Sequence, residues 1–379
     1  MPVAKNVFSR MSDLFASVPS VVKKFASKLE KADGLKAKPT EKVAGSSMAE
    51  KSEAVKFIKA TKPAWDQRKH DEKISSMKRV EAAVADLLDA VEHVEAGLLE
   101  YNHMGSGFTY QKPFTEAPET FLGPATLVGD HSVMGRLKSS DIHGAHAWLS
   151  EPEDQGYDLW HMRETGSWLS LAPGVHTTDE GTKFEVVSCV VKGLRLNRCR
   201  HSLAKQTAKK KTWVAIAQVA DLSIPHAETR GQKDRDPEFK RVYVRVNDGD
   251  GSATLTQQGG SWFNLHKEPR KYNGTATTVS VLFIPEGKGH INGKAYAATR
   301  IRVTYKGTAL TYGEEFAGAL PAVFVSAENR GGDPYTLRLR KRNLANKKGC
   351  EVIADEGMLS KSVDKHHVEE KAQVFILQV

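Results

Sequence analysis

The stretch 213–312 constrains this chain most, because it alternates apolar and polar residues over several short runs. A period of two is what a half-buried β-strand requires, since successive side chains point to opposite faces. One run places its valines on one face and its larger polar residues on the other: Val242, Val244 and Val246 against Tyr243, Arg245 and Asn247. Turn sequences such as NDGDG and PEGKG separate the runs. Short strands at this spacing predict an antiparallel β-sandwich or jelly roll.

Further strands are expected on both sides of this stretch. The run 184–191 (FEVVSCVV) and the C-terminal KAQVFILQV are apolar enough to enter a sheet. The segment 108–173 is rich in glycine and proline and contains Trp148, Trp160 and Trp168. Such aromatic density predicts loops and short strands packed over a core. We therefore expect a mainly β domain at 105–379, with two β-units at 108–200 and 213–379 as one arrangement.

The N-terminal third has a different character and predicts an α-helical extension. Residues 1–33 have the spacing of an amphipathic helix with lysines on its polar side and Phe8, Phe15 and Phe25 on its apolar side. Such a helix either contacts an anionic membrane or a partner groove, or packs on the chain's own β-domain. Residues 34–65 are polar and rich in lysine, which is typical of a flexible linker.

Residues 66–104 predict a coiled-coil-like helix. Apolar residues recur at alternating spacings of three and four: Met77, Val80, Val84, Leu87, Val91, Val94 and Leu98. The seam either pairs with a second copy of the chain or packs on the chain's own sheet. In the first case the oligomerisation residues are Val80, Val84, Leu87, Val91 and Val94.

The formal net charge of +9 and the sequence pI near 9.2 favour an anionic partner. The basic residues gather in two clusters, for which we predict nucleic-acid binding: Arg195, Arg198, Arg200, Lys205, Lys209, Lys210 and Lys211, and then Arg338, Arg340 and Arg342. Neutralising phosphates with such clusters gives binding that weakens steeply with salt. The alternative is that they are solvated loops and protected sheet edges.

The cysteines and the hydropathy of the sequence indicate the cellular compartment in which the protein is expected. Three cysteines without a paired spacing predict reduced thiols in a cytosolic setting. No apolar run is long enough to span a membrane, and the N-terminus lacks the apolar core of a signal peptide. We therefore expect a protein that is neither secreted nor transmembrane.

No motif in the sequence names a reaction. Asp141, His143 and His146 are of metal-ligating types, but no further ligand accompanies them, so hydrogen bonding within a loop is the favoured interpretation. A phosphate-binding glycine loop, a nucleophile elbow and a His-Glu-x-x-His motif are absent from the sequence. We expect a non-enzymatic protein without metal or cofactor.

The order of strands in 213–312 resembles the plant-virus movement proteins of the 30K superfamily. There, a strand of small apolar residues leads to a Val-x-Val strand that ends in a characteristic aspartate. Here WVAIAQVADLSIP leads to VYVRVND, which places Asp248 at the matching position, and the strands TVSVLFIP and RIRVTYKGTALTYG follow.

This resemblance implies a non-enzymatic viral protein that binds single-stranded RNA without sequence preference, self-associates and carries the genome between cells. It also implies the host cell cytoplasm, peripheral membrane contact and plasmodesmata as its location. Other hypotheses stay open: a matrix protein that binds anionic membrane, a jelly-roll capsid protein, and a β-rich enzyme or carbohydrate-binding module that uses the tryptophan-rich segment.

Overall fold

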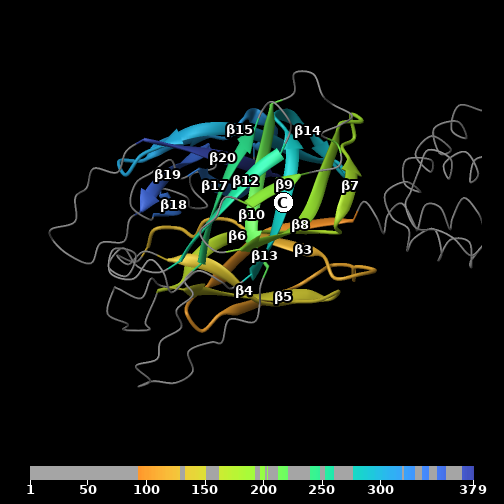
Figure 1. Cartoon of the computed structure of the whole chain (residues 1–379), viewed down its shortest axis with the longest axis horizontal. Helices are drawn as coiled ribbons and strands as arrows, with labels where there is room; N and C mark the ends of the chain where they lie inside the picture. Colours follow the sequence, from red (N-terminus) through yellow and green to blue (C-terminus); the bar gives the residue numbers. More distant parts are fainter. Residues whose placement is uncertain are drawn as a thin grey trace, which may run out of the picture. The chain divides into compact units, whose positions relative to one another are not determined.

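Antiparallel β-sheets make up the part of the chain that the computed structural model describes (Figure 1). The described residues are 93–128, 133–150, 162–192, 197–200, 203, 212–220, 240–247, 252–259, 276–317, 320–328, 335–340, 348–355 and 369–379. All belong to one unit, Glu92–Val379. One short 3-10 turn, Glu314–Phe316, interrupts the strands, and no helix within these residues is long and apolar enough to cross a membrane. The mainly β prediction is confirmed, whereas the predicted helical segments before residue 93 lie outside the described residues.

Two four-stranded sheets form the centre. The first central sheet has the order β10-β13-β8-β7, with strands β10 (Trp213–Val219), β13 (Ala276–Pro285), β8 (Lys183–Lys192) and β7 (Gly174–Thr177). The second central sheet has the order β14-β15-β20-β17, with strands β14 (Gly287–Ile291), β15 (Lys294–Val303), β20 (Glu370–Leu377) and β17 (Ala322–Glu328). The predicted strands at 184–191 and at the C-terminus are confirmed as β8 and β20.

The central parts of both central sheets are buried on both faces. Phe375 of β20 packs in the core between the two central sheets, where it meets Phe184 and Phe324. Its neighbours Val374 and Ile376 point the other way, into a second core. A strand buried on both sides needs apolar residues at every position, which explains why KAQVFILQV reads as a continuous apolar run.

Two three-stranded sheets cover the outer faces of the central pair. The outer sheet, whose dark blue strands lie at the left of Figure 1, has the order β16-β19-β18, with strands β16 (Thr308–Thr311), β19 (Gly349–Asp355) and β18 (Thr336–Arg340). It shares the second core with the second central sheet. The basic sheet has the order β11-β12-β9, with strands β11 (Lys240–Asn247), β12 (Ser252–Gly259) and β9 (Asn197–Arg200). It packs on the first central sheet through a third core that includes Val244, Leu255 and Phe283.

The tryptophan-rich segment, together with residues 94–107 before it, forms two further sheets. They are β1-β6-β3, with β1 (Val94–Tyr101), β6 (Glu164–Leu171) and β3 (Glu119–Leu122), and β2-β5-β4, with β2 (Ser106–Thr109), β5 (Gly144–Ser150) and β4 (Met134–Ser140). Trp168 of β6 stacks on Phe108 of β2 at a ring separation of 4.1 Å. Phe121, Leu169 and Leu171 reach the core between the central sheets, so this segment is part of the same unit.

The predicted heptad helix is wrong at its C-terminal end. Val94 and Leu98 lie in β1, which pairs with β6 in the register Val94↔Leu171. A spacing of four is also a multiple of two, so both residues fall on one face of a strand as readily as on one face of a helix. Val94 is half-buried and packs against the core of its own chain, so it does not lie on a helical seam. The other seam residues, Val80, Val84, Leu87 and Val91, lie outside the described residues.

The prediction of three reduced thiols is also wrong. Cys189 of β8 and Cys199 of β9 form a disulfide, while Cys350 is a buried free thiol. The two bonded cysteines are ten positions apart in the sequence, and this spacing matches no known motif. The two sulfurs meet because the basic sheet packs on the first central sheet, which the sequence alone does not show.

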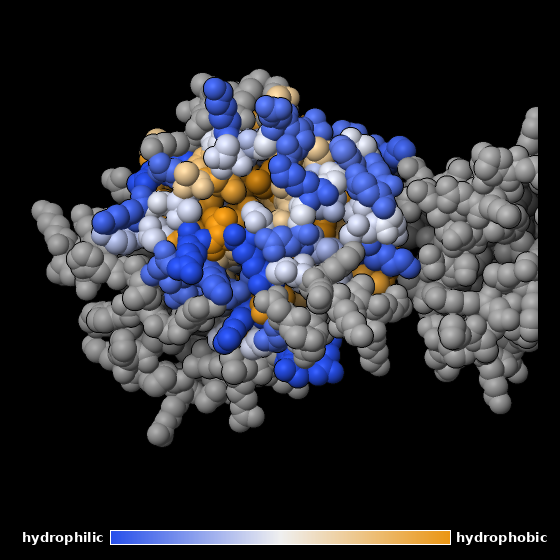
Figure 2. Space-filling view, turned by 90° about the horizontal axis from the view of Figure 1, so that it is seen from above, coloured by the Kyte–Doolittle hydropathy of each residue, from blue (hydrophilic) through white to orange (hydrophobic). Residues whose placement is uncertain are grey.

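One face of the described part of the chain is mostly hydrophilic (Figure 2). Figure 2 shows that hydrophilic residues on this face surround a smaller apolar area. The large apolar side chains exposed among the described residues come from five separate segments: Met104, Val128, Met162, Val190 and Val379. Singly exposed residues of this kind are normal for a folded protein.

Candidate nucleic-acid interface

The outward face of the basic sheet brings together three arginines. The strand register aligns Arg245 of β11 with Thr254 of β12, and Thr254 with Arg198 of β9. The next outward row holds Asn247, Ser252 and Arg200. All three arginine side chains are exposed.

Alternation along each strand explains why these arginines face outward. Their sequence neighbours Val244, Val246 and Cys199 are buried in the core beneath the sheet. Ala253 and Leu255 of β12 point into the same core. Because successive side chains in a strand alternate between faces, the residues between them must point away from the core.

The strands of this face supply basic side chains and no acidic ones. The strands read NRCR, KRVYVRVN and SATLTQQG, so they contain no aspartate or glutamate. The amide of Asn247 donates hydrogen bonds to the hydroxyl oxygens of Ser252 (3.0 Å) and Thr254 (3.1 Å), which fixes a polar lattice between the arginines.

The spacing of the arginines follows from sheet geometry. Arg198 and Arg200 are two residues apart on one strand, or about 7 Å, and Arg245 lies two strands from Arg198, or about 10 Å. Guanidinium groups at these separations can contact several phosphates of one nucleic-acid strand.

A buried tyrosine pair supports the β11 side of the interface. The Tyr243 hydroxyl donates to the backbone oxygen of Tyr335 (3.1 Å) and accepts from its backbone nitrogen (3.2 Å). The Tyr335 hydroxyl donates to the backbone oxygen of Glu328 on β17 (3.2 Å). Burial, with a smaller contribution from the neighbouring Tyr243, raises the pKa of Tyr335 far above its ordinary value. Both rings therefore act as neutral hydrogen-bonding struts between the basic sheet and the second central sheet.

Of the predicted nucleic-acid-binding residues, Arg198 and Arg200 lie on this face. Several others lie outside the described residues, together with the predicted family aspartate and the apolar N-terminal contacts: Arg195, Lys205, Lys209, Lys210, Lys211, Arg342, Asp248, Phe8, Phe15 and Phe25. Arg245 completes the face and is absent from the predicted set. Its position opposite the valines of VYVRVN is the sequence signal that identifies it.

Arg338 is wrongly predicted as a binding residue, because it is fully buried. Its Nη2 donates to Glu164 Oε1 at 2.6 Å, and its Nε donates to the backbone oxygen of Thr126 at 3.1 Å. Nη1 lies 3.6 Å from Asp355 Oδ2. The side chain thus joins the outer sheet to β6 through a buried ion pair, and no ligand reaches it.

Arg340 is also engaged within the protein. Its Nε donates to Glu351 Oε2 at 2.7 Å, across the strand pair that places these residues opposite one another. Its Nη2 donates to the backbone oxygen of Lys306. The described part of the second basic cluster, Arg338 and Arg340, is therefore neutralised by carboxylates.

The metal-ligating types at 141–146 form a turn. Asp141 Oδ1 accepts hydrogen bonds from the backbone nitrogens of His143 (2.7 Å) and Gly144 (3.1 Å), which is the pattern of an Asx turn. Within the described residues, no group of three or more His, Cys, Asp or Glu side chains is arranged to hold a metal ion.

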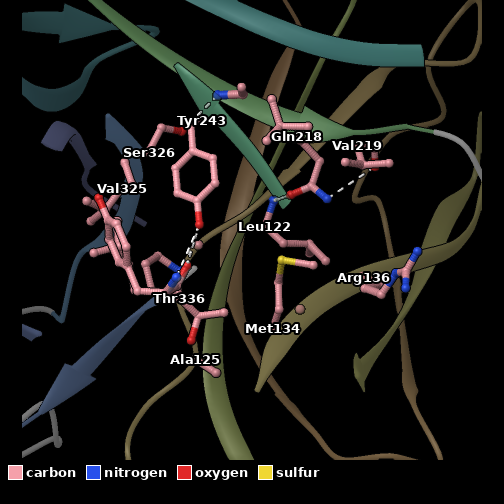
Figure 3. A pocket seen from close by; sticks show the side chains of 18 of the residues that line it. Leu122, Ala125, Met134, Arg136, Gln218, Val219, Tyr243, Val325, Ser326 and Thr336 are labelled. Carbon is pink, nitrogen blue, oxygen red and sulfur yellow. Dashed lines mark hydrogen bonds between the residues drawn. The ribbon is translucent and has the colours of Figure 1, made fainter. Parts of the chain in front are cut away.

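A small cavity lies where β3, β4, β10, β11, β17 and β18 meet (Figure 3). Its volume is about 110 Å³, and polar side chains share its lining with apolar ones, among them Arg136, Gln218 and Thr336. Two of the polar groups in Figure 3 bond to the backbone: Gln218 Oε1 accepts from the backbone nitrogen of Leu122 (3.2 Å), and Ser326 Oγ accepts from that of Ala217 (2.9 Å). A cavity of this size and character is too small for a nucleotide and offers no reactive group.

Comparisons with models of protein families, with curated proteins and with solved structures find no match to this chain. The function is therefore argued from the residues of the interface and from the resemblance in strand order.

Proposed function

We propose that this chain is a non-enzymatic protein that binds single-stranded RNA, without sequence preference, on the outward face of the basic sheet. The observation that carries the proposal is the grouping of Arg198, Arg200 and Arg245 on one exposed sheet face whose strands contain no carboxylate.

Phosphate neutralisation is the source of affinity on such a face. Arginine pairs with phosphate through two parallel N–H donors, and hydroxyl and amide groups like those of Thr254 and Asn247 add sequence-independent contacts. Each phosphate contact on a single strand contributes about −0.7 to the slope of log K against log salt, so three arginines contribute about −2. Base-specific recognition is not expected, because a flat arginine face addresses the backbone.

The biological role that we propose is that of a viral movement protein, which self-associates and carries the genome between cells. The support is the strand order of 213–312, in which β11, the strand before Asp248, also belongs to the basic sheet. Peripheral contact with anionic membrane and action in the host cytoplasm at plasmodesmata are parts of the same proposal.

A viral structural protein is the second candidate. The described outward face carries arginines without an exposed aromatic side chain for base stacking, and such a face also suits the headgroups of an anionic membrane. This favours the matrix protein among the structural alternatives. A jelly-roll capsid protein would be recognised by particle formation.

The test is a salt series of binding to labelled single-stranded RNA and, separately, to anionic liposomes, with the full chain. The variant Arg198→Gln/Arg200→Gln/Arg245→Gln should weaken RNA binding about tenfold or more and reduce the salt slope by about 2. Arg302→Gln is the matched control, because Arg302 is an exposed arginine of β15 that pairs with Glu369 (2.5 Å). Equal slopes for the triple variant and the unmodified chain would contradict the proposed interface, and liposome binding without RNA affinity would favour the matrix protein.

A further inference from the structure

The strand β9 is the least secured part of the interface. It has four residues, whereas β11 and β12 have eight each. It lies at the edge of the order β11-β12-β9, so its strand partner within the basic sheet is β12 alone. Short edge strands hold few backbone hydrogen bonds and open easily. This strand nevertheless carries two of the three exposed arginines.

Cys199 anchors β9 from below. Its side chain is 1% exposed and packs in the core between the basic sheet and the first central sheet. Its sulfur is bonded to Cys189 of β8, a strand of ten residues in the first central sheet. Arg198 and Arg200 flank Cys199 directly, so whatever fixes Cys199 also fixes both arginines.

We propose that the Cys189–Cys199 disulfide is a redox-controlled tie that keeps β9 in the basic sheet and thereby regulates RNA binding. This inference rests on the proposed function of the same face. With the disulfide intact, all three arginines stand in one rigid array. After reduction, β9 is held in the basic sheet only by its few backbone bonds to β12, so it frays from the sheet edge. Arg245 then remains as the ordered arginine of the described face.

The chemistry is thiol–disulfide exchange with a dithiol reductant. A thiolate of the reductant attacks the sulfur of Cys189, which is the more exposed of the two, and the S–S bond breaks to release Cys199 as a thiolate. The second thiol of the reductant attacks the mixed disulfide and releases Cys189. The protein gains two electrons and two protons, and the reductant becomes a disulfide. An oxidised dithiol reverses the reaction.

The experiment compares oxidised and dithiothreitol-reduced full chain. Alkylation and mass spectrometry of the denatured protein first count the free thiols, with one expected before reduction and three after it. Fluorescence anisotropy with labelled oligouridylate across a salt series then gives affinity and slope for each state. Reduction should weaken binding about tenfold and lower the magnitude of the slope by about 1.4, because two phosphate contacts are lost.

Two variants and a second readout complete the design. The variant Cys189→Ala should bind RNA as the reduced chain does, with or without dithiothreitol. The RNA binding of Cys350→Ala should change on reduction as that of the unmodified chain does. Limited trypsin digestion reports on β9 without RNA, since cleavage after Arg198 and Arg200 should accelerate on reduction.

The outcomes separate the two proposals. Equal affinity, slope and cleavage in both redox states overturn the tie and leave RNA binding intact, and three free thiols in the chain after oxidation also overturn it. If neither state binds RNA, the proposed function fails. If trypsin cleavage at β9 still depended on the redox state, the disulfide would still be supported as the bond that holds β9 in the sheet. Cleavage that did not depend on the redox state would overturn that role of the disulfide.

Discussion

Replacing Arg338 by methionine should be among the most destabilising single changes in the described part of the chain. Both Arg338 and Glu164 have fully buried side chains, and their closest atoms are 2.6 Å apart. Methionine fills much of the arginine volume but leaves the Glu164 carboxylate buried without its cation. Thr126 Oγ1 (2.5 Å) and the backbone nitrogen of Val128 (3.0 Å) still donate to it, but neither neutralises its charge.

The expected cost is about 3–5 kcal/mol, the range for breaking a buried pair by removing one partner. At about 2–4 °C per kcal/mol for a unit of this size, the melting temperature should fall by about 10 °C. The double variant Arg338→Met/Glu164→Leu removes both charges and should recover most of the loss, because an apolar pair of similar volume is often neutral or better.

Differential scanning calorimetry of the single variant, the double variant and Arg302→Met measures these values. Arg302→Met is the matched control, since its ion pair with Glu369 is exposed, with side-chain exposures of 71% and 48%. An exposed pair contributes at most about 1 kcal/mol. The reasoning is refuted if Arg338→Met costs no more than Arg302→Met, because the Glu164 carboxylate would then be solvated or neutralised by other means.

Three further predictions follow from local geometry. Gly97→Ala should destabilise the chain by about 1–3 kcal/mol in thermal unfolding, because an added Cβ would lie 2.7–2.9 Å from the ring of Trp168. Burial lowers the pKa of His176 from 6.5 to about 4, so protonation of this side chain favours the unfolded state. About 3 kcal/mol of unfolding free energy should therefore be lost as the pH falls from 6.5 to 4. The variant His176→Gln should flatten that part of the pH profile of the melting temperature. Tyr243→Phe removes both hydrogen bonds to Tyr335 and should accelerate amide exchange in β11 while β20 remains protected.

Much of the strand content was predictable because each strand faces one or two cores. The valines of β11 point into the core, while on the other face Arg245 is exposed and Tyr243 packs on Tyr335; the unbroken apolar run of β20 reflects two buried faces. The β1 strand was missed because the spacing of Val94 and Leu98 satisfies both the heptad and the strand pattern. A spacing of four between two apolar residues fits both a heptad helix and a strand, so the spacing alone does not decide between them.

Whether each arginine is buried in an ion pair or exposed was less predictable, because this depends on residues that are distant in the sequence. Alternation in TLRLR places Arg338 opposite Leu337 and Leu339, but Glu164, which neutralises it, lies 174 residues away. Arg245 shows the reverse case, since its outward position was readable while its alignment with Arg198 required the register of three strands.

The layer order explains why the basic sheet, and not a central one, carries the binding face. Each central sheet is buried on both sides, so arginines at its centre would lose their hydration without gaining a ligand. The strands of the basic sheet place apolar residues in the core and arginines outward. The two covering sheets differ in the carboxylates near their arginines: Glu164, Asp355 and Glu351 neutralise the arginines of the outer sheet, while the strands of the basic sheet contain no carboxylate. The outward face of the basic sheet is therefore a place where exposed arginines gather on strands that contain no carboxylate.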